Sequence, residues 1–418
     1  MKKRVWPSEL KGTVEAPASK SAAQRWIAAA LLAPGTSRLS ISRPGADVAA
    51  ALAAARGLGA DVAEPAPGVV EIRGGLKAAP AEIDCGEAGL SARAFAFIAA
   101  LLPGPVTLRG RGSLNARSMK MVIDPLRALG VVVESNRGRL PLTIKGPLRG
   151  GDVTVEGGAS SQGITGLLLA LPCTPRGGTI TVAGAASRPY LEMTIEVMRA
   201  AGIVLERDGY RRFSIPGGQA YRPRSIAVEG DWSAAAALLA AGAVAGDVEV
   251  TGLDPRSTQA DRRIADVLEL AGADVRIGGG AVGSGRRPLR AFAFDASDCP
   301  DLFPPLTAVA AAADGTSRIA GVRRLRDKES DRARALEDLG RSLGFSVRAE
   351  EDELLVEGGP VRAGRAASWN DHRIAMTAAV LGCVAGGPVE IEDAECVAKS
   401  YPTFYDDLAR LGARIEEV

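Results

Sequence analysis

Six copies of one pattern divide the sequence into units of similar length. In each copy a helix-like segment ends at a Leu-Gly or Ala-Gly pair, and a short β-type run follows. The six glycines recur at a nearly constant spacing, and they are Gly59, Gly130, Gly202, Gly272, Gly344 and Gly412. Glycine just past a helix end predicts a backbone with positive φ, which glycine adopts at little cost. The spacing between the glycines is longer than the repeat of ordinary solenoid proteins, so each repeat has room for several helices and strands. The pattern therefore predicts a mixed fold, α/β of the α+β type, built from six similar units.

A second series of segments lies between these breaks. Ala-rich apolar segments end at a glycine turn, and predicted strands follow at 38–41, 106–108, 180–182, 248–250, 317–319 and 389–391. Each unit therefore contains one helix that is apolar nearly all round, which we expect to be buried. It also contains a second helix with a charged face, as at 331–338, which we expect to be partly solvated.

The length of 418 residues predicts two to four domains. A polar, proline-containing stretch at 219–224 falls between the third and fourth units. We therefore expect two similar lobes of three units each, with the active site in the cleft between the lobes.

Composition excludes several classes of protein. The charges nearly cancel, with 51 Lys+Arg against 49 Asp+Glu, and 46% of residues are hydrophobic. These values argue against a disordered chain and against a protein whose main partner is nucleic acid. The five cysteines form no CxxC pair and there is one histidine, so we expect free thiols and no metal site. The longest apolar stretch, 233–246, is too short to cross a membrane, and no signal peptide is expected.

Polar clusters stand at the start of each apolar segment, where a buried helix does not need them. They are Ser19–Ser21, Glu87–Ser91, 160–162, Asp231–Ser233, Asp298–Asp301 and Asn370–Arg373. Helix N-termini attract anions, so several such ends with Lys and Arg predict a strong anion site. The alternative is ordinary N-capping by Ser, Asp and Asn.

Lysine is rare in the chain, with 9 Lys against 42 Arg. Yet Lys20, Lys328 and Lys399 all fall in polar clusters at predicted helix starts. Because the pKa of a lysine shifts on burial, these residues are candidates for proton transfer.

Six motifs, in order along nearly the whole chain, carry a resemblance to a known family. They are Pro17–Arg25, 160–162, Ser187–Tyr190, Lys328–Arg332, Asn370–Met376 and Lys399–Pro402. With these motifs the sequence resembles the 5-enolpyruvylshikimate-3-phosphate synthase (3-phosphoshikimate 1-carboxyvinyltransferase) family of enolpyruvyl transferases. The resemblance implies transfer of the enolpyruvyl group of phosphoenolpyruvate to the 5-hydroxyl of shikimate 3-phosphate. Phosphate is released by addition and elimination through a tetrahedral intermediate.

The resemblance also implies the organisation of the protein. The family's chain crosses between its lobes twice, which implies one lobe of residues 1–14 plus 225–418 and another of 15–224. It implies a monomeric, cytoplasmic transferase of the shikimate pathway, in chorismate and aromatic amino acid biosynthesis. The two small-molecule substrates are the expected partners, with no cofactor, metal, nucleic acid or membrane.

The resemblance also implies roles for the residues in the matching motifs. The implied catalytic residues are Lys20, Asp301, Glu329 and His372, where Asp301, alone or together with Lys20, accepts the hydroxyl proton and Glu329 protonates the methylene carbon. The implied shikimate 3-phosphate residues are Lys20, Ser21, Arg25, Ser160, Ser161, Gln162, Ser187, Tyr190, Asp301 and Lys328. The implied phosphoenolpyruvate residues are Lys20, Gly89, Arg117, Gln162, Arg332, Arg373 and Lys399. An acid and a base are both required, because an unactivated alcohol must attack an enol ether carbon.

Two alternative functions remain open. A UDP-N-acetylglucosamine enolpyruvyl transferase would share the fold and the donor, but the stretch 110–121 lacks that family's reactive cysteine and Ser21, not Asn, follows Lys20. A non-catalytic anion-binding protein of the same fold would need no acid and base.

Glu87 and Leu90 depart from the family pattern of the glycine-rich loop around Gly89. A bare carboxylate there would repel phosphoenolpyruvate, so we expect Glu87 to pair with Arg93 or Arg117. The alternative is that Glu87 only caps the helix that starts near Gly89.

Overall fold

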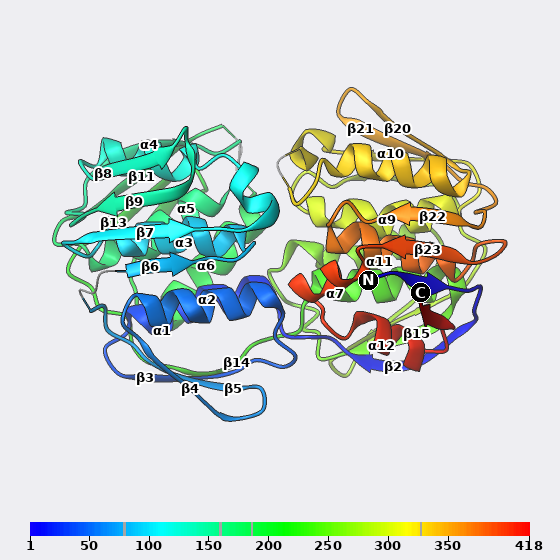
Figure 1. Ribbon diagram of the computed structural model, residues 1–418, viewed down its shortest axis with the longest axis horizontal. Coiled ribbons are helices and arrows are strands. Elements are labelled where there is room, and N and C mark those ends of the chain that lie inside the picture. The colour runs from blue at the N-terminus through cyan, green and yellow to red at the C-terminus, as the bar shows by residue number, and fades with distance from the viewer. Residues whose placement is uncertain (78–80, 159–160, 185–186, 327) are drawn as a thin grey trace. The chain divides into compact units, whose positions relative to one another are not determined.

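The computed structural model describes residues 1–77, 81–158, 161–184, 187–326 and 328–418 (Figure 1). Its backbone contacts divide the chain into two compact units. The continuous unit is Lys20–Val228, and the discontinuous unit joins Met1–Ser19 to Glu229–Val418. Both boundaries lie a few residues further along the chain than the sequence predicted.

The described residues form six four-stranded sheets, three in each unit, with one shared order. In every sheet an outer strand runs parallel to its neighbour, and two antiparallel strands complete the other side. The sheets of the continuous unit are, in spatial order, β14 (Ser225–Ala227), β3 (Thr36–Ser40), β5 (Val69–Arg73) and β4 (Asp61–Ala66); β6 (Ala81–Asp84), β7 (Pro105–Arg109), β9 (Arg139–Lys145) and β8 (Val132–Asn136); and β10 (Val153–Glu156), β11 (Gly177–Ala183), β13 (Arg212–Pro216) and β12 (Glu206–Asp208). Those of the discontinuous unit are β2 (Leu10–Glu15), β15 (Gly246–Thr251), β17 (Ala281–Gly285) and β16 (Asp274–Gly278); β18 (Ala293–Asp295), β19 (Thr316–Ala320), β21 (Glu353–Glu357) and β20 (Ser346–Glu350); and β22 (Gly364–Ala367), β23 (Val389–Glu392), β1 (Lys3–Val5) and β24 (Ile415–Glu417).

Two sets of helices accompany the sheets. The apolar set is α1 (Lys20–Leu32), α3 (Gly89–Ala99), α5 (Ser161–Ala170), α7 (Trp232–Ala245), α9 (Phe303–Ala311) and α11 (His372–Gly382). The second set is α2 (Ala46–Gly57), α4 (Lys120–Ala128), α6 (Arg188–Ala200), α8 (Ile264–Leu270), α10 (Arg332–Leu343) and α12 (Phe404–Arg410). Short 3₁₀ helices are η1 (Gly112–Ala116), η2 (Leu171–Cys173), η3 (Ala260–Arg263), η4 (Pro300–Leu302), η5 (Val322–Leu325) and η6 (Ala394–Lys399).

The core of each unit is formed by the apolar helices, as predicted. In the discontinuous unit α7, α9 and α11 pack against one another (Figure 1), and in the continuous unit α3 packs against α5 and α1. Nearly every residue of α7 is buried, because its Ala-rich sequence lets neighbouring helices approach on all sides. In contrast, α10 buries one face and leaves its charged face to solvent.

The six repeat glycines adopt the backbone that the sequence predicted. Their φ angles lie between +79° at Gly344 and +108° at Gly412. Each follows a helix of the second set, where a side chain would strain the left-handed turn.

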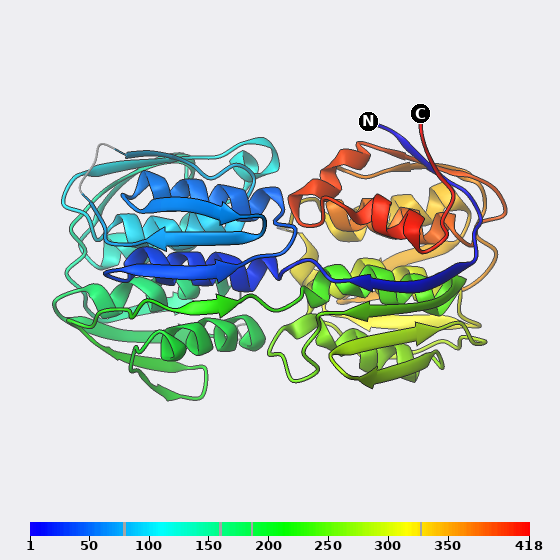
Figure 2. The same ribbon diagram turned by 90° about the horizontal axis from the view of Figure 1, so that it is seen from below.

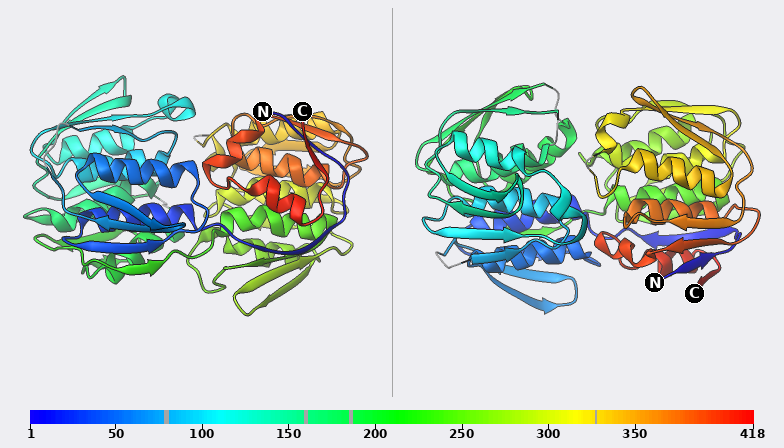
Figure 3. Two further views of the ribbon diagram at one scale, coloured as in Figure 1. Left: turned by 60° about the horizontal axis from the view of Figure 1, so that its bottom comes forward. Right: turned by 45° about the horizontal axis from the view of Figure 1, so that its top comes forward.

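The two units exchange a strand where the chain passes between them. β2 precedes α1 of the continuous unit, yet it pairs in parallel with β15 of the discontinuous unit. Conversely β14 precedes α7, yet it pairs in parallel with β3 (Figure 2). Because of this pairing, residues 225–228 lie in the continuous unit rather than starting the other one. The N-terminal strand β1 lies between β23 and β24, so both chain ends belong to one sheet (Figure 3).

One predicted strand is wrong in position. The repeat predicts a β-type run directly after Gly202, at 203–205, but β12 begins at Glu206. The side chain of Gln219 accepts from Val204 N–H at 2.8 Å and donates to Val204 C=O at 3.0 Å. An amide side chain therefore takes the place of a neighbouring strand at this residue.

Candidate active site

The polar clusters predicted from the sequence lie at the N-terminal ends of the buried helices. Lys20, Gly89, Ser161 and His372 are the first residues of α1, α3, α5 and α11, and Asp301 lies in η4 just before α9. Two of these helices are N-capped by aspartate: Asp231 caps α7 and Asp371 caps α11. Capping thus explains part of the clusters, but it does not explain their lysines and arginines.

In the continuous unit the structure brings Gly89, Arg117 and Gln162 together, with Arg93 beside them. Arg93 donates to Oε1 of Gln162. A Cβ atom at Gly89 would lie 3.1 Å from Nη1 of Arg117 and 3.6 Å from Nη1 of Arg93. A side chain at Gly89 would therefore press on Arg117 and touch Arg93. The result is two guanidinium groups at the open N-terminus of α3, where an anion is favoured.

Arg25 is buried and bonds only neutral acceptors among the described residues. Its Nη1 donates to Ser21 O at 2.7 Å, Nη2 to Tyr190 O at 3.0 Å, and Nε to Oγ1 of Thr194 at 2.9 Å. Burial lowers the pKa of Arg25 to about 10, which Tyr190 only partly opposes. Arg25 therefore brings an uncompensated positive charge next to Ser21 and Tyr190.

The remaining predicted residues of this unit lie at helix starts. Lys20 Nζ lies 3.1 Å from Oδ2 of Asp47, in the first turn of α2. Ser161 and Ser187 are buried. Ser160 lies outside the described residues.

Asp301 is the centre of a charged cluster in the discontinuous unit. Its Oδ1 accepts from Nη1 of Arg332 and lies 3.4 Å from Nζ of Lys328. Its Oδ2 lies 3.0 Å from Nη2 of Arg373. Four residues that the sequence named separately are therefore in direct contact.

Arg332 holds a second carboxylate of the prediction, Glu329. The guanidinium is 1% exposed, with Nη2 2.6 Å from Oε2 of Glu329 and Nε 2.8 Å from Oδ2 of Asp371. Burial opposes its charge, but the carboxylates of Asp371, Glu329 and Asp301 outweigh burial and hold the pKa of Arg332 well above its usual value. Asp301 and Glu329 thus share one permanent cation, an arrangement that offers a proton acceptor and a proton donor beside an anion-attracting charge.

A fourth carboxylate, Asp261, adjoins this cluster. Arg373 donates to Ser233 O at 3.2 Å, and the hydroxyl of Ser233 donates to Oδ2 of Asp261. Burial and the nearby charge of Asp301 raise the pKa of Asp261 to about 6, against the opposing effects of Arg373 and Ser233. For Arg373 itself, burial lowers the pKa, but the carboxylates of Asp301, Asp261 and Asp231 together outweigh burial and raise it.

Lys328, His372 and Lys399 complete the predicted set. Burial lowers the pKa of Lys328, although Asp301 works in the other direction. His372 is buried, with Nδ1 3.8 Å from Oδ1 of Asp371. Lys399 Nζ donates to Asn370 O at 2.6 Å, which ties η6 to the loop before α11.

Three carboxylates that hold site cations were not among the predicted site residues. Asp371 binds Arg332, Asp47 binds Lys20, and Asp261 is bound to Arg373 through Ser233. Asp371 stands inside the quoted cluster Asn370–Arg373, so its motif was a usable signal. No motif in the sequence marks Asp47 or Asp261, because each acts on a site cation that lies in a different segment of the chain.

Comparison with known proteins identifies the family. The family model described as EPSP synthase (3-phosphoshikimate 1-carboxyvinyltransferase) matches residues 6–408. The chain belongs to the EPSP synthase family. The resemblance and the predicted class of enzyme, a transferase, are thereby confirmed.

Relatives within the EPSP synthase family match along their whole length. The 3-phosphoshikimate 1-carboxyvinyltransferase of Methanocorpusculum labreanum is 39% identical, covering 100% of both chains, and that of Aeropyrum pernix is 40% identical, covering 99% of this chain and 96% of the relative. A solved EPSP synthase from Acinetobacter baumannii is 28% identical, with a TM-score of 0.82 and full coverage of both chains. The enolpyruvyl transferase NikO from Streptomyces tendae, 18% identical with a TM-score of 0.79 over 100% and 98% of the two chains, shares the fold.

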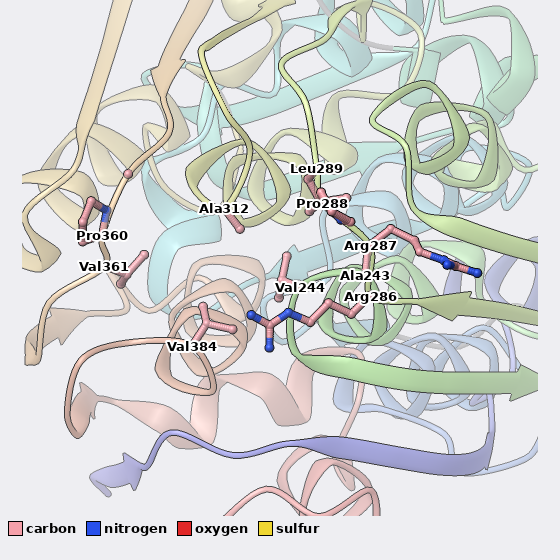
Figure 4. Close-up of a pocket in the computed structure, with 11 residues that line it drawn as sticks. Ala243, Val244, Arg286, Arg287, Pro288, Leu289, Ala312, Pro360, Val361 and Val384 are labelled. Carbon is pink, nitrogen blue, oxygen red and sulfur yellow. The ribbon is translucent and has the colours of Figure 1, made fainter.

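A pocket of about 550 Å³ lies away from these residues in the discontinuous unit (Figure 4). Its lining includes Ala243 and Val244 in the last turn of α7, Ala312 after α9, and Val384 after α11. It therefore lies at the opposite helix ends from the charged cluster and contains none of the predicted site residues. Within the described ranges, no three metal-binding side chains gather at one place, and no helix is long and apolar enough to span a bilayer.

Proposed function

We propose that this EPSP synthase family member transfers the enolpyruvyl group of phosphoenolpyruvate to the 5-hydroxyl of shikimate 3-phosphate. The hydroxyl oxygen adds to C2 of phosphoenolpyruvate while a proton adds to C3, giving a tetrahedral adduct. A C3 proton and the phosphate then leave, and the vinyl ether and inorganic phosphate remain. The observation that carries this proposal is the contact of both Asp301 and Glu329 with Arg332. Anion binding alone would need the cation but not two carboxylates beside it.

In the discontinuous unit we assign the proton transfers. Asp301 accepts the hydroxyl proton, and Glu329 donates to the methylene carbon. The guanidinium of Arg332 favours the charged form of Glu329. An anion bound at Arg332 would compete for the guanidinium and favour the neutral form that can donate a proton.

The cations Arg332, Arg373 and Lys399 bind phosphoenolpyruvate in this proposal. Guanidinium groups bind phosphate and carboxylate with paired, charge-assisted hydrogen bonds. Lys328 lies beside the base Asp301, and we assign Lys328 and His372 to assist the proton transfers. The lowered pKa of Lys328 makes it able to exchange protons more readily than an exposed lysine.

In the continuous unit we assign the binding of both substrates. Gly89, Arg117 and Gln162 take phosphoenolpyruvate, since they already form one cluster at the start of α3. Lys20, Ser21, Ser160, Ser161, Gln162, Ser187 and Tyr190 take shikimate 3-phosphate. Arg25 joins them by its charge and by fixing Ser21 and Tyr190, since Nη1 and Nη2 each donate one N–H to a backbone carbonyl and each carry a second N–H for the substrate.

We also propose a monomer that works in the cytoplasm without metal or cofactor. The five cysteines are free thiols, and four of them are buried, which suits a reducing compartment. The proposed reaction involves proton transfer and group transfer but no redox step, so its balance requires no cofactor.

Phosphate release tests the proposal. Purified protein with phosphoenolpyruvate and shikimate 3-phosphate, in the presence of a chelator, should release inorganic phosphate. UDP-N-acetylglucosamine should not replace shikimate 3-phosphate. Release with the nucleotide sugar alone would establish the sister activity, and tight binding of both anions without any release would establish a binding protein.

A further inference from the structure

The acidic residue Glu87 stands in the loop that leads into α3. Gly89, only two residues later, begins the helix whose N-terminus lies against Arg117. A carboxylate at this place carries the wrong charge for a phosphoenolpyruvate site. Its carboxylate must therefore either repel the substrate or be held by neighbouring groups of the protein.

A hydroxyl connects Glu87 to Arg117. Ser113, in η1, donates its Oγ–H to Oε2 of Glu87 at 3.3 Å. The same Oγ accepts from Nη2 of Arg117 at 3.1 Å. A serine hydroxyl can donate and accept at once, so the three side chains form a continuous chain from carboxylate to guanidinium.

The backbone holds the two loops together at this point. Arg111 N–H donates to Gly86 O at 2.7 Å, and Arg111 also pairs with Asp84. Gly112 has a φ of +49°, and a Cβ atom there would lie 2.6 Å from the carboxyl carbon of Glu87. The backbone angle therefore favours glycine at 112, and a side chain there would displace the carboxylate of Glu87.

Arg117 is oriented through one of its terminal nitrogens. Nη2 is bonded to Ser113, while Nη1 points to the start of α3, 3.1 Å from where a Cβ of Gly89 would stand. The buried Nε has no hydrogen-bond partner among the described residues. The bond to Ser113 is therefore what fixes the rotation of the guanidinium toward the anion site.

We propose that Glu87 is a positioning residue for phosphoenolpyruvate, acting through Ser113 on Arg117. The inference rests on the proposed function, because it takes Arg117 as a phosphoenolpyruvate ligand. Glu87 polarises the hydroxyl of Ser113, which strengthens the bond from Arg117 and keeps the guanidinium in place. The sequence had left open a direct pair with Arg93 or Arg117 and a simple capping role.

The test compares Glu87→Ala, Glu87→Gln and Ser113→Ala by the KM for phosphoenolpyruvate and by equilibrium binding of phosphoenolpyruvate. The Ala variants should weaken binding on the order of tenfold, as expected for the loss of one hydrogen bond to a charged group. Gln should cost less, because it keeps an acceptor for Ser113. The kcat and the KM for shikimate 3-phosphate should stay close to those of the parent. Ser113→Ala changes no charge, so it separates the hydrogen bond from simple repulsion.

The matched control is Glu82→Gln, which removes a carboxylate from the strand β6 that precedes this loop. Glu82 pairs with Arg109 at the surface, away from Arg117. It should leave the KM for phosphoenolpyruvate unchanged. In an Arg117→Ala background, Glu87→Ala should no longer weaken binding and should even tighten it, since only the repulsive charge is then removed.

Two results would overturn the proposal. If Glu87→Ala tightens binding in the parent protein, the carboxylate is only a repulsive charge. If Glu87→Ala weakens binding but Ser113→Ala does not, Glu87 acts without Ser113. A parent protein that releases no phosphate would instead contradict the proposed function. The equilibrium binding of phosphoenolpyruvate would still test the role of Glu87 in that case.

Discussion

Replacing Glu329 with glutamine should lower kcat by on the order of 100-fold or more, the loss expected when a general acid is removed. Glutamine is nearly the same size, but it cannot give a proton to the methylene carbon. Its substitution also removes a negative charge 2.6 Å from Nη2 of Arg332. The KM for phosphoenolpyruvate should therefore stay constant or fall, because Arg332 becomes more available to an anion.

Glu337→Gln is the matched control for this variant. Glu337 lies on α10, the helix that follows Glu329, and accepts from the backbone N–H of Ala349 at 2.8 Å. The control should keep its turnover. A Glu329→Gln protein with normal kcat and a raised KM would show that Glu329 only orients Arg332.

Replacing Asp301 with asparagine should lower kcat by roughly 100-fold to 10,000-fold, the range for loss of a positioned base. The amide cannot accept the hydroxyl proton of shikimate 3-phosphate. It also releases Arg373 and Lys328 from a shared carboxylate. Binding of phosphoenolpyruvate should not weaken, since the cluster becomes more positive.

The control for Asp301 is Asp298→Asn, the same change slightly earlier in the same loop. Steady-state kinetics of both variants, with thermal unfolding to verify folding, make the comparison. Equal losses of kcat in the two variants would mean that the loop, and not the carboxylate of Asp301, is required. A variant Asp301→Asn that is folded and fully active would remove Asp301 from the mechanism.

The repeated architecture could be predicted because it depends on local chemistry. Gly59 and its five equivalents adopt positive φ at helix ends, and such a requirement is visible in the sequence alone. The buried helices could be predicted in the same way, since an apolar helix such as α7 has no polar face that could lie against solvent. The pairing partners of β2 and β14 could not be predicted, because each of these strands pairs with a segment that lies far away in the sequence.

The site was predicted in its residue types but not in its connections. The motifs singled out Asp301, Glu329 and Arg332 without indicating that one guanidinium binds both carboxylates. Asp261 could not be found at all, because its raised pKa comes from burial and from Asp301, which belongs to a different helix start. Similarly, the side chain of Gln219 bonds the backbone of Val204, and no periodicity of the sequence reveals this contact.

In the proposed mechanism, C3 of phosphoenolpyruvate is first protonated and a C3 proton is lost later. The most direct measurement is to run the reaction in D₂O with both substrates and to analyse the product by mass spectrometry and NMR. The mechanism predicts inorganic phosphate and an enolpyruvyl ether that carries deuterium in its vinyl methylene group, because the transient methyl group gains a deuteron before it loses a proton. A product that forms at the normal rate with no deuterium at that carbon would contradict it.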